Sequence, residues 1–239
     1  MKIAMWSGPR NLSTAMMYAF GSRADCAIWD EPFYAAYLVI TKADHPMRDE
    51  TIAQGITDAN AVAQHLIGKI PNDRDYFYQK HMVHHMVEQM PLDWMKEVRN
   101  VFLIRHPARV VASYLKKREA PVLEDLGFGA TEALYQRAAG FGQRPVVIDS
   151  ADIRNDPAGM LQQLCRALEI PWDPAMLAWP AGGRAEDGPW APHWYGAIHR
   201  STGFDGPEGP MPEIPADYRS LVEAGLPEYE RFKTRALRP

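Results

Sequence analysis

Short apolar runs recur along the chain, and each has the length of a buried strand. They cover Lys2–Trp6, Cys26–Trp29, Val98–Ile104 and Pro145–Ile148, with a more aromatic run at Tyr76–Gln79. Strands that are buried on both faces of a parallel sheet read as continuous apolar runs rather than as alternating patterns. The pattern therefore predicts four parallel strands and a fifth in the aromatic run.

Stretches with a helical spacing of apolar residues stand between these runs. One begins at Leu12, one spans Thr57–Ile70, one carries Pro107 in its first turn, and one follows Asp156 with Pro157 at its first position. Asp is a favoured N-cap residue, and proline loses little at the start of a helix because its missing N–H would be unpaired there. Strands that alternate with helices predict an α/β fold, with a mostly parallel sheet covered by helices on both faces.

The composition changes after Ile170. Residues 171–215 hold nine of the twenty prolines and four of the seven tryptophans. A disordered linker would be depleted in aromatic residues, so we interpret this stretch as an ordered irregular segment that covers the active site. The alternative is a surface-packed tail with no catalytic part. The chain of 239 residues suits a single α/β domain, 1–239, that includes this segment.

Charge and cysteine content narrow the setting. The chain has 26 Lys and Arg against 30 Asp and Glu, a net charge of −4 with no basic run, which argues against nucleic acid as a partner. No apolar stretch reaches the roughly 18–20 residues of a membrane span, and the N-terminus reads as a strand rather than as a signal peptide. Cys26 and Cys165 cannot form a disulfide framework. We expect a cytoplasmic protein in which Cys165 is a buried thiol.

The segment Ser7–Thr14 joins the first predicted strand to the first predicted helix. Its backbone N–H groups and the helix dipole can converge on an anion, and an arginine adds a planar cation. The alternative is a plain turn in which Ser13 or Thr14 only caps the helix. The Gly-Lys pair of a Walker A loop is missing, so the segment suits a short phosphate group better than a Mg-bound triphosphate. The candidate anion-binding residues are Gly8, Pro9, Arg10, Asn11, Leu12, Ser13 and Thr14.

A second candidate phosphate site follows the strand Val98–Ile104. Arg105 stands at the C-terminal end of this strand, which is the edge where ligands bind in open α/β sheets. Ser113 lies two turns into the next helix, on a face that could look back toward the first loop. In isolation, Arg105 could equally form a structural ion pair, and Ser113 could be a small packing residue.

Together the two motifs resemble those of the sulfotransferases that use 3′-phosphoadenosine 5′-phosphosulfate (PAPS). The loop G-P-R-x-x-S-T is similar to the 5′-phosphosulfate loop of that superfamily, nearest to its bacterial carbohydrate-type branches. The sequence R-x-P-x-x-x-x-x-S-Y, about a hundred residues later, is similar to the 3′-phosphate motif, and Val146–Trp172 resembles the last βα unit. The resemblance implies a P-loop-like three-layer fold, PAPS as the donor co-substrate, and no metal.

The resemblance also assigns roles to the two motifs. Arg10, Ser13 and Thr14 would hold the 5′-phosphosulfate, and Arg105 and Ser113 would hold the 3′-phosphate. The best-known cytosolic members have lysine in place of Arg10. Arginine stabilises negative charge but is a poor proton donor, because its pKa exceeds about 12.

Related enzymes close a basic, glycine-containing loop over the 3′-phosphate. The stretch His199–Gly203 matches this loop by position, which makes Arg200 and Ser201 candidate donor contacts. An ordinary turn with an exposed arginine is the alternative.

Sulfonate transfer needs a base for the acceptor, and two residues are candidates. Glu31 follows the second strand, and several sulfotransferase branches place a catalytic glutamate at a similar position. An apolar surround would raise its pKa toward a useful value. His81 is the second candidate, because Lys80-His81 resembles the Lys-x-His region of cytosolic members with one residue missing. Lys80 is then a contact to substrate or donor.

Histidines and aromatic residues add two weaker patterns. His81, His84 and His85 form H-x-x-H-H, which could bind a metal, although core or active-site histidines are the simpler interpretation. Stacking aromatic side chains could form a pocket for a flat or sugar-like acceptor, or could equally belong to the core. These aromatic residues are Phe33, Tyr34, Tyr37, Trp190, Trp194 and Tyr195.

These patterns predict an enzyme that moves a sulfonate group from PAPS to a hydroxyl or amine of a small-molecule acceptor. One rival is an ATP-dependent kinase of similar fold, in which Asp149 at the end of a strand would serve as a Walker B acid. A second rival is a non-catalytic protein that binds a nucleotide with the same fold.

Overall fold

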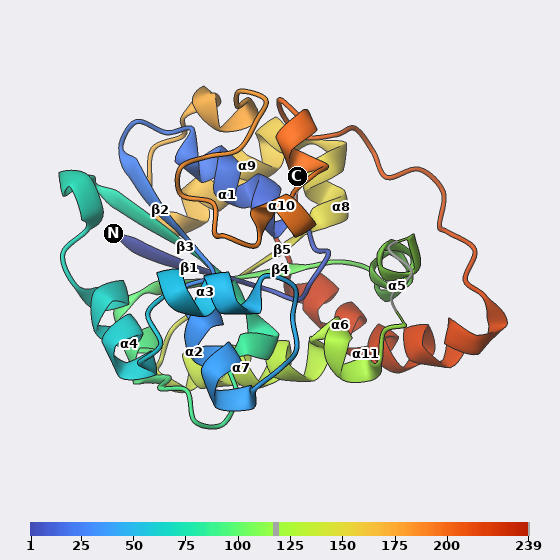
Figure 1. The fold of residues 1–239 in the computed structure, drawn as a ribbon. Coiled ribbons are helices and arrows are strands. Elements are labelled where there is room, and N and C mark those ends of the chain that lie inside the picture. The colour runs from blue at the N-terminus through green and yellow to red at the C-terminus, as the bar shows by residue number, and fades with distance from the viewer. Residues whose placement is uncertain (117–119, 239) are drawn as a thin grey trace.

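Five parallel strands form one sheet at the centre of the structure, a computed structural model that describes residues 1–116 and 120–238 (Figure 1). The strand order is β2-β3-β1-β4-β5, so the first strand lies in the middle. The strands are β1 Lys2–Ser7, β2 Cys26–Asp30, β3 Tyr76–Met82, β4 Arg99–Ile104 and β5 Val146–Asp149. All four pairings are parallel, so the carboxyl ends of the strands meet at one edge.

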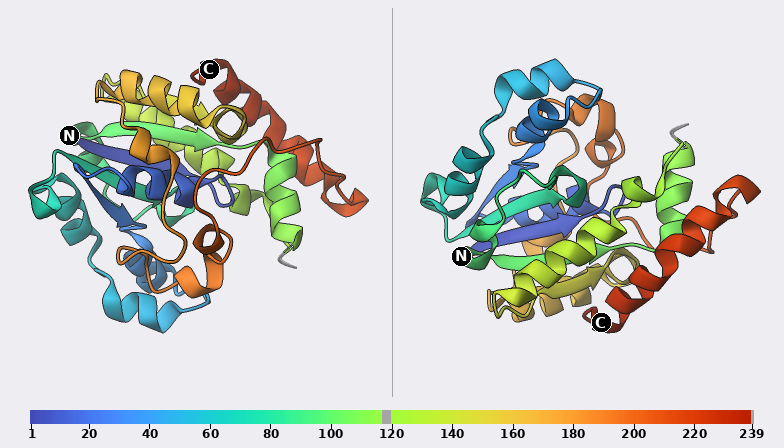
Figure 2. Two further views of the ribbon diagram at one scale, coloured as in Figure 1. Left: turned by 90° about the horizontal axis from the view of Figure 1, so that it is seen from above. Right: turned by 90° about the horizontal axis from the view of Figure 1, so that it is seen from below.

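Helices cover both faces of the sheet (Figure 2). One face carries α1 Ser13–Gly21, α8 Ser150–Asn155 and α9 Pro157–Leu168. The other carries α4 Ala59–Ile67, α5 Pro107–Lys116, α7 Phe128–Gly140 and α11 Arg219–Arg235. The shorter helices are α2 Tyr34–Thr41, α3 Arg48–Gln54, α6 Leu123–Leu126 and α10 Ala191–Trp194.

The strand pleat divides the core into two layers. In β1, Ile3 and Met5 pack into the cluster on the α1 and α9 face, while Ala4 and Trp6 pack into the cluster on the opposite face. Successive side chains of a strand point to opposite faces, so a strand buried on both sides needs apolar residues at every position. This requirement explains why β1 reads as a continuous apolar run.

The predicted fold class is confirmed: the sheet is parallel and lies between two helical layers. All five predicted strands are present, and β3 runs on to Met82, so Lys80 and His81 stand inside a strand. The helix predicted over Thr57–Ile70 is shorter, because the Asp58 side chain accepts hydrogen bonds from the N–H groups of Asn60 and Ala61 and the helix ends before Gly68.

Seven of the eleven α-helices that the structure describes had no counterpart in the sequence prediction. The helix α2 is apolar around most of its circumference, so it shows little helical periodicity. The helix α11 contains Gly225 and Pro227 in its interior, and both residues normally argue against a helix. The remaining five are α3, α6, α7, α8 and α10.

Asp149, at the end of β5, is fully buried and serves the structure. Its side chain accepts a hydrogen bond from the N–H of Ala151, which caps α8, and a 2.8 Å hydrogen bond from the Tyr229 hydroxyl of α11. Lys233 of α11 is 2.8 Å from the same carboxylate. Asp149 therefore joins α8 and α11 to the sheet. Because these contacts occupy its carboxylate, they do not favour a Walker B role for Asp149.

Two further sequence expectations concern the cysteines and membrane-spanning helices. Cys26 and Cys165 are both buried free thiols, which confirms the prediction for Cys165. Over residues 1–116 and 120–238, none of the helices combines the length and the apolar character that crossing a membrane requires.

Replacing Tyr229 by phenylalanine tests the link between α11 and the sheet. Tyr229→Phe removes one donor from the buried Asp149 carboxylate, so the free energy of unfolding should fall by about 1–3 kcal/mol in urea denaturation. Tyr135→Phe is the matched control, because the Tyr135 ring packs on Phe232 of the same helix and keeps this contact without its hydroxyl. Equal losses in the two variants would contradict the link.

Candidate active site

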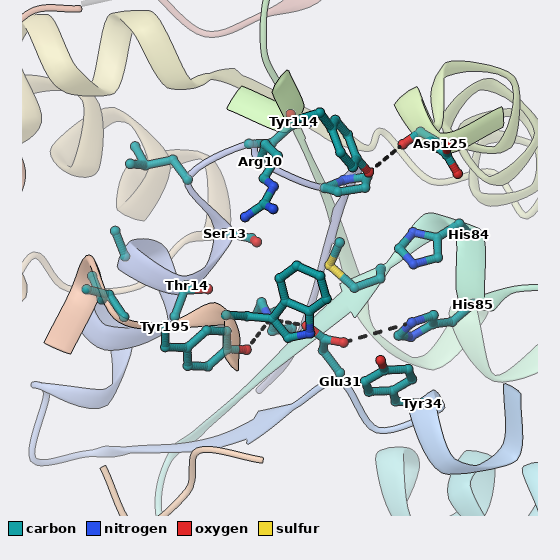
Figure 3. A pocket seen from close by; sticks show the side chains of 18 of the residues that line it. Arg10, Ser13, Thr14, Glu31, Tyr34, His84, His85, Tyr114, Asp125 and Tyr195 are labelled. Atoms are coloured by element: carbon teal, nitrogen blue, oxygen red, sulfur yellow. Dashed lines mark hydrogen bonds and ion pairs between the residues drawn. The ribbon is translucent and has the colours of Figure 1, made fainter. Parts of the chain in front are cut away.

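A cavity of about 730 Å³ lies at the carboxyl edge of the sheet. Its walls come from the loop after β1, the residues after β2 and β3, and the segment that follows α10. Figure 3 shows Arg10, Ser13 and Thr14 on one side, and Tyr34, His84 and His85 on the other. Open α/β sheets bind ligands at this edge, so the strand order itself places the cavity where ligands are expected.

The loop after β1 turns sharply into α1. Arg10 and Leu12 have φ angles of 63° and 73°, in the left-handed region. Leu12 is the N-cap, and within the described residues no side chain caps the helix. Ser13 and Thr14 stand inside the first turn and line the cavity, so neither residue caps the helix. The first N–H groups of a helix have no partner within the helix and attract anions.

The rest of the loop is held in place by the two neighbouring segments. A Cβ atom at Gly8 would stand 2.7 Å from the carbonyl oxygen of Leu126, so this position requires glycine for a close approach of backbones. The Asn11 side chain donates a 3.3 Å hydrogen bond to the carbonyl of Leu103 in β4. Pro9, Arg10, Asn11 and Leu12 all line the cavity, whereas Gly8 acts in packing.

Arg10 reaches over two aromatic rings. Its guanidinium carbon is 5.4 Å from the ring centre of Tyr114 and 5.2 Å from that of Trp194, both within the range of a cation–π interaction. Tyr114 belongs to α5 and Trp194 to α10, so the Arg10 side chain bridges two elements that border the cavity. This places a permanent positive charge next to the start of α1.

A buried group of charges forms the floor of the cavity. The Lys80 ammonium is 2.9 Å from Asp30 and contacts Glu31 directly. The Tyr195 hydroxyl donates to Asp30 at 2.7 Å and accepts a hydrogen bond from Lys80 at 2.7 Å. The indole N–H of Trp190 donates to the same hydroxyl at 3.1 Å. One lysine therefore pairs with two carboxylates, and a tyrosine from the C-terminal segment adds further hydrogen bonds.

Burial and these partners set the pKa values of the group. Burial raises the pKa of Glu31 above its ordinary value, and the positive charge of Lys80 opposes this rise. Burial disfavours the charge on Lys80, but Asp30 and Glu31 together outweigh it and raise the pKa of the lysine. Glu31 lines the cavity while Asp30 does not, so Glu31 is the carboxylate available to a ligand.

The three histidines of the H-x-x-H-H motif separate in the structure. His81 stacks on Trp6 with ring centres 4.5 Å apart and does not line the cavity. His84 and His85 line the cavity, and His85 lies between the rings of Tyr34 and Tyr37 at 4.5 and 4.8 Å. Among residues 1–116 and 120–238, no group of three His, Cys, Asp or Glu is arranged to hold a metal ion.

The histidine next to Glu31 was not assigned a role in catalysis from the sequence. The Nε2 atom of His85 is 3.9 Å from a carboxylate oxygen of Glu31 (Figure 3). Burial lowers the pKa of His84 to about 4 and that of His85 well below its ordinary value, so both rings are neutral at pH 7. Besides the charged Lys80, the surround of Glu31 therefore contains neutral imidazole and phenol rings.

The predicted 3′-phosphate residues have different outcomes. Arg105 donates a 2.6 Å hydrogen bond to the carbonyl of Arg10 and forms an ion pair with Glu208. Ser113 does not line the cavity. Arg200 is exposed, and Ser201 lines the cavity while its hydroxyl bonds to Trp179 and Ile198. The structure thus brings Arg105 to the loop after β1. Arg105, Ser113 and Arg200 all lie outside the cavity wall.

Part of the segment 171–215 lies against the cavity. It contributes Trp194, Tyr195, Ala197, Ile198, Ser201, Gly203, Phe204 and Asp205 to the wall. Among the aromatic residues considered for an acceptor pocket, Tyr34 and Tyr37 also line it, whereas Phe33 and Trp190 are buried in the core.

The fold and the site define an α/β protein with a helix N-terminus and an arginine facing a buried carboxylate across a cavity. Its family model is that of the sulfotransferase domain, which matches residues 1–236, so the chain belongs to the sulfotransferase domain family.

Solved sulfotransferase domains share the fold over nearly the whole chain. The domain from the Synechococcus PCC 7002 olefin synthase has a TM-score of 0.57 at 15% identity, covering 98% of this chain and 94% of that one. The domain from the curacin biosynthetic pathway has a TM-score of 0.53 at 14% identity, covering 99% and 98%. A sulfotransferase from Alicyclobacillus acidocaldarius has 0.53 at 12% identity, covering 99% and 96%. At these identities the likeness concerns the fold.

Two curated plant proteins are more similar in sequence. Branched-chain-amino-acid aminotransferase-like proteins 2 and 1 of Arabidopsis thaliana are each 37% identical, over 227 and 232 residues. The matches cover 95% and 97% of this chain but 40% and 41% of those proteins. The chain thus spans about 40% of the length of these relatives.

The buried histidines predict an acid-sensitive fold. Burial lowers the pKa of His81 to about 3, whereas an unfolded histidine titrates near 6.5. Between these values the unfolded chain binds more protons, so the free energy of unfolding should fall as the pH falls below about 6.5, by up to about 1.4 kcal/mol per pH unit for each such histidine. Urea denaturation at pH 7, 6 and 5 measures this slope.

His81→Phe tests the contribution of one ring. Phenylalanine keeps the stacking on Trp6 but cannot be protonated, so the dependence of stability on pH should become shallower. His193→Gln, at an exposed position, is the control and should leave the slope unchanged. An unchanged slope in His81→Phe would mean that His81 does not contribute to the acid sensitivity.

Proposed function

We propose that this protein transfers a sulfonate group from PAPS to a hydroxyl or amine of a small-molecule acceptor. The observation that carries the proposal is the cavity itself, which joins the uncapped start of α1 and Arg10 to Glu31. A group-transfer site needs an anion-binding wall for the donor and a base for the acceptor in one cavity. Membership of the sulfotransferase domain family supports this assignment.

The residues of the donor wall fit a phosphosulfate group. Arg10, Ser13 and the first N–H groups of α1 supply positive charge and hydrogen-bond donors without a capping side chain in competition. Arg105, bonded to the carbonyl of Arg10, is the proposed contact to the 3′-phosphate. Trp194, which lines the same cavity, provides apolar surface for a nucleoside.

Glu31 is the proposed general base. Its carboxylate accepts the proton of the acceptor hydroxyl while that oxygen forms a bond to the sulfur and the bond from sulfur to the donor phosphate oxygen breaks. The raised pKa of Glu31 favours proton acceptance, and Lys80 holds the carboxylate in position. Arg10 and the start of α1 stabilise the negative charge that develops on the departing phosphate. Arg10 acts by charge alone, because it is a poor proton donor.

His85 and Tyr34 complete the acceptor side. His85 stacks on Tyr34, 4.5 Å between ring centres, and its Nε2 atom lies near Glu31. A neutral, aromatic surround excludes water from the carboxylate and so strengthens its interaction with a proton on the acceptor. We propose that these rings orient the acceptor over Glu31.

Replacing Glu31 by glutamine tests the base. Glu31→Gln keeps the size of the side chain but removes its ability to take a proton, so turnover of PAPS with a panel of hydroxyl and amine acceptors should fall about a hundredfold or more. Binding of 3′-phosphoadenosine 5′-phosphate (PAP) should persist. Glu223→Gln, at an exposed position on α11, is the control. Undiminished turnover in Glu31→Gln would rule out Glu31.

Thermal-shift titration distinguishes the donor from that of a kinase. A ligand that binds the native state alone raises the melting temperature, so PAP should stabilise the protein more than ATP with Mg²⁺. Arg105→Ala should lose most of the response to PAP. Stabilisation by ATP with Mg²⁺ and none by PAP would instead support the kinase hypothesis. PAP binding without turnover of any acceptor would indicate a binding protein.

A further inference from the structure

Three arginines converge on one buried carboxylate beside the donor loop. The Nε atom of Arg105 donates to the Glu208 carboxylate at 2.8 Å, and Arg109 pairs with its other oxygen at 2.8 Å. Arg154 is 3.8 Å from the first oxygen. The Glu208 side chain is only 4% exposed, so these ion pairs are buried in the structure rather than exposed on its surface. The sequence analysis assigned a role to Arg105 alone, because Arg109 stands at a variable position of the second motif and Arg154 lies outside both motifs.

The charges of this cluster do not balance. Three guanidinium groups face one buried carboxylate, and Asp205, 3.9 Å from Arg154, has a side chain that is 78% exposed. One Glu208 oxygen lies near Arg109 without the geometry of a hydrogen bond. A carboxylate with a single charge therefore leaves positive charge and donors in excess. A phosphate monoester, with about two negative charges and three oxygen acceptors, matches the cluster better.

The arginines and the glutamate belong to different parts of the fold. Arg105 follows β4, Arg109 lies in α5 and Arg154 in α8, so all three are held by regular elements packed on the sheet. Glu208 stands in the long connection between η5 Ile198–Arg200 and η6 Ala216–Tyr218 (Figure 1).

This connection holds no helix of its own and is rich in glycine and proline. The three arginines are therefore held in place by the regular elements of the fold. Glu208, which binds them, lies on a segment with few backbone constraints. The segment also contributes Phe204 and Asp205 to the cavity wall, which places the cluster next to the proposed nucleotide site.

We propose that Glu208 occupies the site of the donor's 3′-phosphate, so that donor binding and docking of residues 204–209 compete for the same three arginines. This inference rests on the proposed function, since it assumes a donor with a 3′-phosphate. The carbonyl groups of Gly206, Glu208 and Gly209 also accept hydrogen bonds from Arg154 and Arg109. A donor phosphate would release these contacts together with the carboxylate.

The competition selects for the nucleotide that carries the phosphate. A ligand without a 3′-phosphate offers nothing to replace Glu208 and leaves the segment docked. A 3′-phosphate carries more negative charge than the Glu208 carboxylate, so it displaces Glu208 from the arginines and releases residues 204–209. Glu208 therefore sets the threshold for donor binding and discriminates between nucleotides with and without the second phosphate.

Affinity measurements on Glu208→Gln test this inference. The variant keeps the size of the side chain but removes the competing charge, so PAP should bind about tenfold more tightly by isothermal titration calorimetry. Adenosine 5′-monophosphate, which lacks the 3′-phosphate, should bind with unchanged affinity. Glu213→Gln is the matched control, because Glu213 is exposed on the same connection. Arg154→Ala should weaken binding of PAP and leave adenosine 5′-monophosphate unaffected.

Hydrogen–deuterium exchange supplies a second readout on the wild-type protein. PAP should increase amide exchange over residues 204–209, whereas adenosine 5′-monophosphate should not. In Glu208→Gln the exchange of this segment should already be raised without ligand. Thermal melts of Glu208→Gln and Arg154→Ala show whether each variant is folded.

The outcomes separate this inference from the proposed function. If PAP binds neither the wild type nor Glu208→Gln, the proposed function fails. If PAP binds both with equal affinity and leaves exchange over 204–209 unchanged, the donor and Glu208 do not compete, and the proposed function stands. Weaker PAP binding by Glu208→Gln would show that Glu208 orients the arginines for the donor, which also overturns the competition.

Discussion

A buried lysine between two carboxylates is the constraint on which the site depends. Lys80 and Asp30 are almost completely removed from solvent, and each ion would be costly there without its partners. The pair is possible because β2 and β3 are neighbours in register, with Asp30 opposite Lys80. The sheet therefore positions the charges, and Glu31, one residue further, emerges into the cavity already bonded to the lysine.

Most of the fold and part of the site could be predicted from the sequence, and individual residues explain why. The strands could be predicted because burial on both faces demands a continuous apolar run, and the donor loop because it stands at a strand-to-helix junction. The role of Lys80 could not be predicted, because it depends on Tyr195, a residue distant in the sequence whose hydroxyl donates to Asp30. Glu208 was missed for the same reason, since its arginines lie about a hundred and about fifty residues away.

The segment after α9 is attached to both halves of the cavity by polar contacts. Tyr195 fixes it to the charges beneath Glu31, and Glu208 fixes it to the arginines beside the donor loop. The two anchors differ in kind. The Tyr195 hydroxyl donates to Asp30 and accepts from Lys80 and Trp190, whereas Glu208 leaves positive charge uncompensated. The same segment is thus held by a fully hydrogen-bonded contact at Tyr195 and by an unbalanced ion-pair cluster at Glu208.

The contact between Tyr195 and Asp30 also constrains how the chain reaches its native state. The two residues are separated by 165 positions, and contacts of such separation form late because closing the loop between them costs entropy. Until the later residue arrives, the interior holds a lysine and two carboxylates with incomplete hydrogen bonding. During synthesis the sheet strands emerge first, so Glu31 acquires its final environment only after most of the polypeptide has left the ribosome.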